Sequence, residues 1–504
     1  MSSLSSSRGE AGAPPYVSSG ERAARDAALA CAAALAVALG VGRFAFTPLL
    51  PLMLAGGELD IRHGGWLASA NYAGYFVGAM TCARIAVDPV RMVRYGLVAT
   101  VALTLAMGIA SPFWVWALVR FVGGAVSAWT FVFASQWGLR RVAERGALAW
   151  GGVIFTGPGV GIVVTGLIGS VLAGQRAALG WIGFAAASAV LSAVVWRAFG
   201  TTAREPVRDA GGERSRNGAE NGGDAAGAAD ASGRAEARRA IGLAGATNAT
   251  NATNATNATN ATNATNATNA TNATNAATAI SAKNFTSANV ARPREAVAAS
   301  TGSAPNASPA DARRDAFWLV LLYGLPGFGY IVTATFLPVI ARAALPARSP
   351  WPDLFWPMFG AALIVGALLG ARLPSRWDNR LLLAVCCAVQ AIGVALGIVW
   401  PTAPGFALGS ALVGLPFTAI TLFAMREARR LRGERAAGLM GYATASYGVG
   451  QIVGPLAAAP LAAHAGSFSP ALWLASAVLA VGAAGFAAVA LHATRAAKHG
   501  SGVA

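Results

Sequence analysis

Charged side chains are scarce in this sequence. Asp, Glu, Lys and Arg make up 12% of its 504 residues, which is about half the share that is usual in a soluble domain. Hydrophobic residues make up 55%, and the mean hydropathy is +0.52. These values exclude an ordinary soluble protein and predict a membrane protein with the lipid bilayer as its main partner.

The motifs that carry chemistry are also missing. No Gly-x-x-x-x-Gly-Lys-Ser/Thr stretch occurs, so nothing indicates that the chain hydrolyses ATP. The 4 cysteines form no Cys-x-x-Cys pair and the 4 histidines are dispersed, so no metal-binding spacing exists. We therefore expect no enzyme activity, no cofactor and no metal site.

Long apolar segments fill most of the chain, and each is long enough to cross a bilayer, which takes about 20 residues. We predict an all-α membrane protein with twelve transmembrane helices in two pseudo-symmetric six-helix bundles. The predicted spans are 26–54, 66–87, 92–110, 113–137, 147–172, 178–199, 316–342, 353–373, 379–400, 403–425, 436–463 and 467–492.

Polar segments separate and flank these bundles. Residues 1–23 and 200–315 offer little apolar surface to bury, so we expect a disordered N-terminus and a disordered low-complexity linker that contains a Thr-Asn-Ala repeat. The bundles then occupy 24–199 and 316–493, and 494–504 forms a tail.

Arginines are distributed unevenly over the loops. The loops on the side of the N-terminus hold Arg84, Arg91, Arg94, Arg140, Arg141, Arg145, Arg372, Arg376, Arg380, Arg426, Arg429, Arg430, Arg432 and Arg435, whereas the opposite loops hold Arg62, Arg176, Arg342 and Arg348. Basic loops stay on the cytoplasmic side of a membrane. We therefore predict that both termini are cytoplasmic, and we attribute the net charge of +17 to topology rather than to nucleic-acid binding.

The two halves of the chain repeat each other at three places. The matches join Gly42–Pro51 to Gly329–Pro338, Gly78–Arg84 to Gly366–Arg372, and Gly157-Pro158 to Gly454-Pro455, at offsets of 287, 288 and 297 residues. Parallel six-helix repeats are one known way to build a transporter, with the substrate site at the repeat interface near the midplane of the membrane.

Local motifs carry a family resemblance. Arg120 with Gly123 and Gly124 resembles the fourth-helix arginine motif of the major facilitator superfamily. Gly157-Pro158-Gly159-Val160-Gly161 resembles its glycine- and proline-rich antiporter motif. The loop after the second span departs from the superfamily pattern, because Asp88 lies outside the usual Gly-x-x-x-Asp-Arg/Lys-x-Gly spacing.

Three longer strings resemble the YbfB/YjiJ-like bacterial branch of that superfamily. They are Gly42-Arg43-Phe44 with Thr47-Pro48-Leu49-Leu50-Pro51, Asn71-Tyr72 with Gly74-Tyr75, and Gly327-Phe328-Gly329-Tyr330 with Thr335-Phe336-Leu337-Pro338. The resemblance implies a multi-pass permease of the bacterial inner membrane, and it implies no particular substrate.

Arg43 lies inside the first span. A charged side chain near the bilayer centre costs about 2.5–3.5 kcal/mol, so it faces a protein interior or a wet cavity. Pro48 and Pro51 remove backbone donors, which indicates a broken helix. We interpret this stretch as the wall of a translocation path; the alternative is an arginine that only ties helices together.

Polar and aromatic residues in other spans extend the predicted path. No acidic residue lies deep in a span, which disfavours a protonated relay. Guanidinium groups suit carboxylate or phosphate, so we predict a small anionic or zwitterionic solute with Arg43 as its first contact and Arg120 in a mainly structural role. The predicted path comprises Arg43, Phe46, Asn71, Tyr72, Tyr75, Arg120, Gln136, Tyr330, Thr335, Gln390, Tyr447 and Gln451.

A second set of residues is predicted to serve gating or close helix packing, because small residues let helices approach in lipid and prolines let them bend. On the inner face, ion pairs of Arg84 with Asp88 and within the cluster of Arg372, Arg376 and Asp378 are expected to hold an outward-open state; the alternative is ordinary loop charge. The set comprises Pro48, Gly157, Pro158, Gly454, Pro455, Arg84, Asp88 and Arg372.

The predicted function is secondary active transport by alternating access. We expect a monomer that is driven by a gradient, and the sequence does not identify a coupling ion. Efflux of amphipathic compounds is the alternative within transporters. A non-transporting membrane sensor is the alternative outside them, but residues 200–315 have the composition of a linker rather than of an output domain.

Overall fold

A computed structural model describes residues 19–147, 150–200, 309–374, 376–433 and 436–500. In this part of the chain the regular elements are all helices, and no strand occurs. Most of the predicted N-terminal segment and linker lies outside the described residues.

Three predicted boundaries need correction where the structure describes them. Helix α1 begins at Ser19 rather than at residue 24, and α10 begins at Pro309 rather than at residue 316. The predicted tail from residue 494 is helical as far as Gly500. Each helix therefore continues about one to three turns beyond its apolar core, because polar residues can extend a helix whose packed part is already formed.

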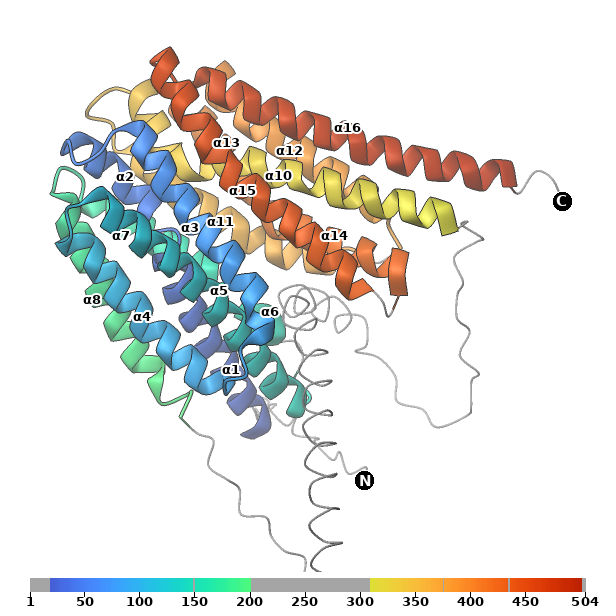
Figure 1. Ribbon diagram of the computed structural model, residues 1–504, viewed down its shortest axis with the longest axis horizontal. Coiled ribbons are helices and arrows are strands. Elements are labelled where there is room, and N and C mark those ends of the chain that lie inside the picture. The colour runs from blue at the N-terminus through green and yellow to red at the C-terminus, as the bar shows by residue number, and fades with distance from the viewer. Residues whose placement is uncertain (1–18, 148–149, 201–308, 375, 434–435, 501–504) are drawn as a thin grey trace, which may run out of the picture.

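The described helices form two groups, which lie against each other in Figure 1. The N-terminal half contains α1 (Ser19–Leu35), η1 (Ala36–Val41), α2 (Phe46–Ala55), α3 (Ile61–Thr81), η2 (Cys82–Arg84), α4 (Pro89–Ile109), α5 (Phe113–Glu144), α6 (Gly151–Ile154), α7 (Gly157–Val171) and α8 (Ala177–Trp196). The C-terminal half contains α10 (Pro309–Ala344), α11 (Trp351–Arg372), α12 (Asn379–Val399), α13 (Ala403–Gly414), α14 (Phe417–Arg432), α15 (Ala436–Ala465) and α16 (Ser469–Gly500).

Among the described residues, 10 helical segments are long and apolar enough to cross a membrane. Helices α3 and α15 are not among them, although they are 21 and 30 residues long. These two helices pack against each other across the halves, so glycine, hydroxyl and amide residues replace the apolar surface that a lipid-facing helix needs. The count of twelve crossings therefore stays a prediction.

The first predicted span is interrupted. The π-helical turn η1 ends at Val41, and the backbone N–H groups of Arg43 and Phe44 both reach the Leu39 carbonyl, at 3.2 and 3.1 Å. Helix α2 then restarts at Phe46, which places Pro48 in its first turn, where a missing N–H does no harm. The break turns Arg43 out of a regular helical register.

Hydrogen bonds and close backbone contacts join the two halves. Thr47 Oγ1 donates to the Ala334 carbonyl at 3.0 Å, and these two residues are 287 positions apart, which is the offset between the two repeats. Nearby, Ser69 Oγ donates to the Ile452 carbonyl at 2.8 Å, and a Cβ on Gly65 would lie 2.8 Å from the Pro455 carbonyl oxygen. The contacts of Ser69 and Gly65 join α3 to α15, and that of Thr47 joins α2 to α10.

Helix α7 forms a second contact between the halves, which we call the α7 seam. Its glycines pack closely both on its own half and on the opposite one. A Cβ on Gly157 would lie 2.2 Å from the Ala32 carbonyl oxygen within the N-terminal half. A Cβ on Gly159 would lie 2.5 Å from Ile364 Cγ1 of α11, in the other half. The glycines of this motif therefore let α7 lie between its own bundle and the opposite one.

Candidate functional site

A cavity of about 340 Å³ lies between the two halves. Met80 at the end of α3, Gly152 of α6 and Arg372 at the end of α11 line it, whereas the contacts of Thr47 and Ser69 close the molecule on the other side. Met80 and Arg372 are exposed, so the cavity opens at the ends of the bundles that carry the arginine-rich loops. Its volume falls in the range of small-molecule pockets, about 300–1,000 Å³.

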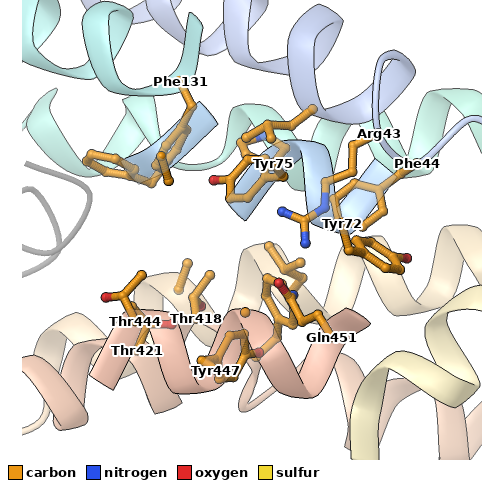
Figure 2. A pocket seen from close by; sticks show the side chains of 18 of the residues that line it. Arg43, Phe44, Tyr72, Tyr75, Phe131, Thr418, Thr421, Thr444, Tyr447 and Gln451 are labelled. Carbon is orange, nitrogen blue, oxygen red and sulfur yellow. The ribbon is translucent and has the colours of Figure 1, made fainter. Parts of the chain in front are cut away.

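Arg43 points into this cavity from the helix break (Figure 2). Its guanidinium carbon lies 4.2 Å from the ring centroid of Tyr75 and 5.1 Å from those of Phe44 and Tyr72. The side chain is 6% exposed. Its Nε and Nη2 atoms are buried and find no hydrogen-bond acceptor among the described residues. The aromatic faces hold the cation in place and leave these N–H groups unused.

The described lining contains no Asp, Glu or His that would neutralise Arg43. The other charged lining residue is Arg372, which is exposed at the mouth. An unpaired buried cation is costly unless a counter-ion joins it. The cavity is therefore positive at its deep end and suited chemically to an anion.

Arg120 lies behind the cavity rather than in its lining. Its Nη2 donates to the Arg43 carbonyl at 3.3 Å and its Nε to the Leu67 carbonyl at 3.4 Å. The guanidinium covers the Phe46 ring at 4.7 Å, and Asn71 Nδ2 donates to the Arg120 carbonyl at 2.9 Å. Arg120 thus supplies a donor to a carbonyl freed by the break in the first span, and it positions Arg43 through the backbone.

The opposite wall belongs to the C-terminal half and carries hydroxyl and amide groups. Tyr447 lies between two other tyrosine rings, 4.9 Å from Tyr323 and 5.9 Å from Tyr330, both stacked. Gln451 donates to the Tyr330 hydroxyl, and the Tyr323 hydroxyl donates to Thr421 Oγ1 at 3.1 Å. Figure 2 shows Tyr447 and Gln451 across the cavity from Arg43.

Several predicted path residues do line the cavity, and others support it. The lining includes Arg43, Tyr72, Tyr75, Tyr447 and Gln451. Directly behind them lie Phe46, Asn71, Arg120, Tyr330 and Thr335, each in contact with a lining residue or with Arg120. The structure brings these residues together from five helices, α2, α3, α5, α10 and α15, and from the break in the first span.

Two predicted path residues lie away from the cavity. Gln390 is buried and donates to the Val413 carbonyl at 3.1 Å, which ties α12 to α13. Gln136 is half-buried on α5 and is not among the lining residues. A polar side chain in a span can thus serve helix packing alone.

The sequence reasoning missed much of the lining. Apolar residues in an apolar span look alike, and no pattern distinguishes cavity residues from core residues. Thr418 and Thr421 offered a weak clue, since positions three apart on a helix share one face. The missed lining includes Phe44, Phe76, Met80, Phe131, Phe155, Tyr323, Phe417, Thr418, Thr421 and Thr444.

The predicted packing residues occupy close contacts. Pro158 lines the cavity. A Cβ on Gly454 would lie 2.3 Å from Ile331 Cγ2, and one on Gly169 would lie 2.8 Å from Pro48 Cβ. These contacts join spans within each half, while the Pro455 carbonyl contacts Gly65 across the halves.

The predicted inner-face ion pairs take another form. Asp88 makes no ion pair with Arg84 among the described residues; its carboxylate caps α4 by accepting the Arg91 N–H at 3.1 Å. Asp378 pairs with Arg380 at 3.1 Å rather than with Arg372. Burial opposes ionisation of the Asp378 carboxyl, but the hydrogen bonds from Arg380 outweigh burial and hold its pKa below the usual value.

Comparison with known protein families gives a match over most of the chain. The family model described as "Uncharacterised MFS-type transporter YbfB" matches residues 35–220 and 252–486, which include both halves and every lining residue of the cavity. Among curated proteins, none is found to match the chain.

Proposed function

The chain belongs to the MFS-type transporter family of YbfB, and on that premise we propose that it carries a small anionic or zwitterionic solute across the bacterial inner membrane by secondary active transport. Family membership supports a multi-pass membrane transporter and implies a transporter rather than an enzyme. The observation that carries the choice of solute is the buried guanidinium of Arg43, whose Nε and Nη2 have no acceptor in the described residues.

The topology that we propose has twelve crossings and cytoplasmic termini. Helices α3 and α15 add to the 10 apolar spans because both are long enough to cross and they pack against each other across the two halves. The arginine-rich loops mark the cytoplasmic side. In that orientation the cavity opens inward, and the molecule works as a monomer.

The mechanism is alternating access by rocking of one half against the other. The opposite state requires the seams of α3 with α15 and of α7 with α11 to separate, while the halves close around the present mouth. Closure removes water from the cavity, so an unpaired Arg43 opposes it and a bound anion permits it. The solute thereby takes part in the conformational change as well as in binding.

Efflux of amphipathic compounds is a second candidate, and the lining favours it in one respect. Aromatic and aliphatic side chains, such as Phe76, Phe131 and Leu368, form much of the cavity wall. A neutral amphipathic compound would bind there without Arg43. Dependence on Arg43 therefore separates the two candidates.

The test uses the full-length protein in proteoliposomes with a panel of labelled anions, amino acids and neutral amphipathic compounds. We expect Arg43→Gln to lower uptake of the best anion at least about 30-fold, because one partner of a buried charge pair is lost. Arg43→Lys keeps the charge but loses the planar fork, so it retains part of the activity. Monodisperse elution of each variant in detergent is the control for folding.

Unchanged anion transport by Arg43→Gln would remove Arg43 from the mechanism. Transport of neutral amphipathic compounds alone, by native protein and variant equally, would establish efflux in its place.

A further inference from the structure

The two walls of the cavity differ in chemistry. On the N-terminal half, Phe76, Phe131 and Phe155 present aromatic surface to the cavity. On the C-terminal half, threonine hydroxyls accompany the tyrosine stack, and Figure 2 shows Thr418, Thr421 and Thr444 across from Phe131, displaced along the cavity from Arg43. A ligand that fills this space meets a cation at one end, an apolar face on one side and hydroxyls on the other.

The charge of the lining limits the charge of the ligand. Arg43 is the buried cation of the described lining, Arg372 is exposed at the mouth, and no described lining residue is acidic. A dianion would leave one charge unpaired in the deep end, and a zwitterion would bring an ammonium group without a carboxylate partner. Both are costly in a partly desolvated site, so a single negative charge fits best.

Unused hydrogen-bonding groups mark two separate contact points. Arg43 Nε and Nη2 are buried without an acceptor, and Thr418 Oγ1 is buried without a partner in the described residues. Beside it, Thr421 accepts from the Tyr323 hydroxyl and keeps its own hydroxyl proton for another acceptor. Buried polar groups are normally satisfied, so the second point calls for a polar substituent on the body of the ligand.

We propose that the substrates are aromatic monocarboxylates with a hydroxyl substituent on the ring, the carboxylate on Arg43 and the hydroxyl at Thr418 and Thr421. The ring then packs against the aromatic wall, where stacked and edge contacts are favourable. The volume of about 340 Å³ suits a compound of one ring. This inference rests on the proposed function and narrows its solute from any small anion to this class.

The test is a binding series on the purified full-length protein in detergent, measured by calorimetry. The compounds are 4-hydroxybenzoate, benzoate, lactate, phthalate, phenylalanine and benzamide. We expect the tightest binding for 4-hydroxybenzoate, then benzoate, with benzamide at least about 10-fold weaker because it lacks the charge-assisted contact. Tighter binding of lactate, phthalate or phenylalanine than of benzoate would overturn the proposal.

A pair of variants tests the second contact point. Thr418→Val keeps the shape and removes the hydroxyl, so the preference for 4-hydroxybenzoate over benzoate falls by about 2- to 10-fold, as for one neutral hydrogen bond. Thr165→Val is the matched control, because Thr165 is buried on α7, bonds to the Gly161 carbonyl and does not line the cavity. An unchanged preference in Thr418→Val would overturn the hydroxyl contact.

The experiments distinguish a failure of the proposed function from a failure of this inference. If Arg43→Gln abolishes transport of a compact anion such as lactate and aromatic acids are not bound, the transporter proposal stands and the aromatic class is wrong. If Arg43→Gln leaves binding of every carboxylate unchanged, both are wrong.

Discussion

Arg43 and Tyr330 hold equivalent positions in the two halves, 287 residues apart, yet their surroundings differ in kind. Arg43 lies in a break between two helices and has two N–H atoms without an acceptor. Tyr330 lies inside the continuous helix α10, accepts from Gln451 and stacks on Tyr447. The repeat supplies two similar scaffolds, and at this pair of equivalent positions only the N-terminal residue leaves buried N–H groups for a solute to satisfy.

The two halves also differ in their ion pairs at the helix ends that we propose to be cytoplasmic. In the C-terminal half, Glu427 is 1% exposed and joins Arg430, Arg380 and Asn379. In the N-terminal half, the ion pair at the end of α5 links Arg140 and Glu144, and both side chains are more than half exposed. The C-terminal half thus has a buried ion-pair cluster where the N-terminal half has an exposed pair, so we expect the C-terminal half to be the more firmly held of the two at this end.

The largest expected effect is a difference in the free energy of unfolding between variants of the two buried arginines of the N-terminal half. Arg120→Gln leaves the Arg43 carbonyl without its donor and removes the contact with the Leu67 carbonyl, so the free energy of unfolding falls by about 2–4 kcal/mol. Arg43→Gln removes an unpaired buried cation and leaves that free energy unchanged or higher. Thermal unfolding of both variants in detergent measures the difference.

Glutamine at both positions changes charge equally, so each variant controls for the other. Equal destabilisation by the two substitutions would show that Arg43 has structural partners of the same strength as Arg120, and the contrast between an orphaned and a satisfied arginine would be lost.

Sequence patterns predicted Arg43 because a fixed charge in an apolar span has few places to go. They also predicted an irregular first span from Pro48 and Pro51, but the irregular stretch lies before both prolines, and Pro51 lies inside α2. They misplaced Gln390, because a carbonyl of a neighbouring helix satisfies an amide as well as a solute does. They missed Phe131, because whether an aromatic residue faces lipid, core or cavity depends on helix rotation, which composition does not report.

The ion-pair prediction shows a different limit. Asp88 and Arg84 are close in sequence, but Asp88 caps α4, since a carboxylate just before a helix is better used by the free N–H groups of its first turn. Closeness in sequence alone does not predict whether a carboxylate caps a helix or forms an ion pair.

A middle-sized effect is expected at the seam of α7. Gly159→Ala places a Cβ 2.5 Å from Ile364 Cγ1 and 3.1 Å from the Gly360 carbonyl oxygen, so the present state becomes less stable by about 1–3 kcal/mol. Gly183→Ala on α8 is the matched control, because nothing lies within 4 Å of its Cβ. Uptake rates in proteoliposomes measure both.

We expect the rate to change about 5-fold or more in Gly159→Ala, and to stay near the native value in Gly183→Ala. Native rates in both variants would mean that the approach of α7 to α11 does not limit transport, and the seam would then belong to packing alone.

The smallest expected effect is a loss of stability when an ion pair is removed, and we compare this loss between the two halves. Glu427→Gln removes the carboxylate that Arg430 contacts at 2.6 and 2.8 Å. Arg380 keeps Asp315 and Asp378 and Arg430 is 41% exposed, so the loss is about 1–2 kcal/mol rather than the full cost of an isolated buried charge. Glu144→Gln in the exposed pair costs about 0.5 kcal/mol or less.

Thermal unfolding at low and high salt separates the two carboxylates further. Salt screens the exposed pair and leaves the buried one nearly intact, so the effect of Glu427→Gln persists at high salt while that of Glu144→Gln disappears. Equal effects at low salt would contradict the view that the C-terminal half is the more firmly held of the two. In the mechanism that we propose, such a bundle, braced at its mouth, rotates as one body, and the half that carries Arg43 adjusts around the bound anion.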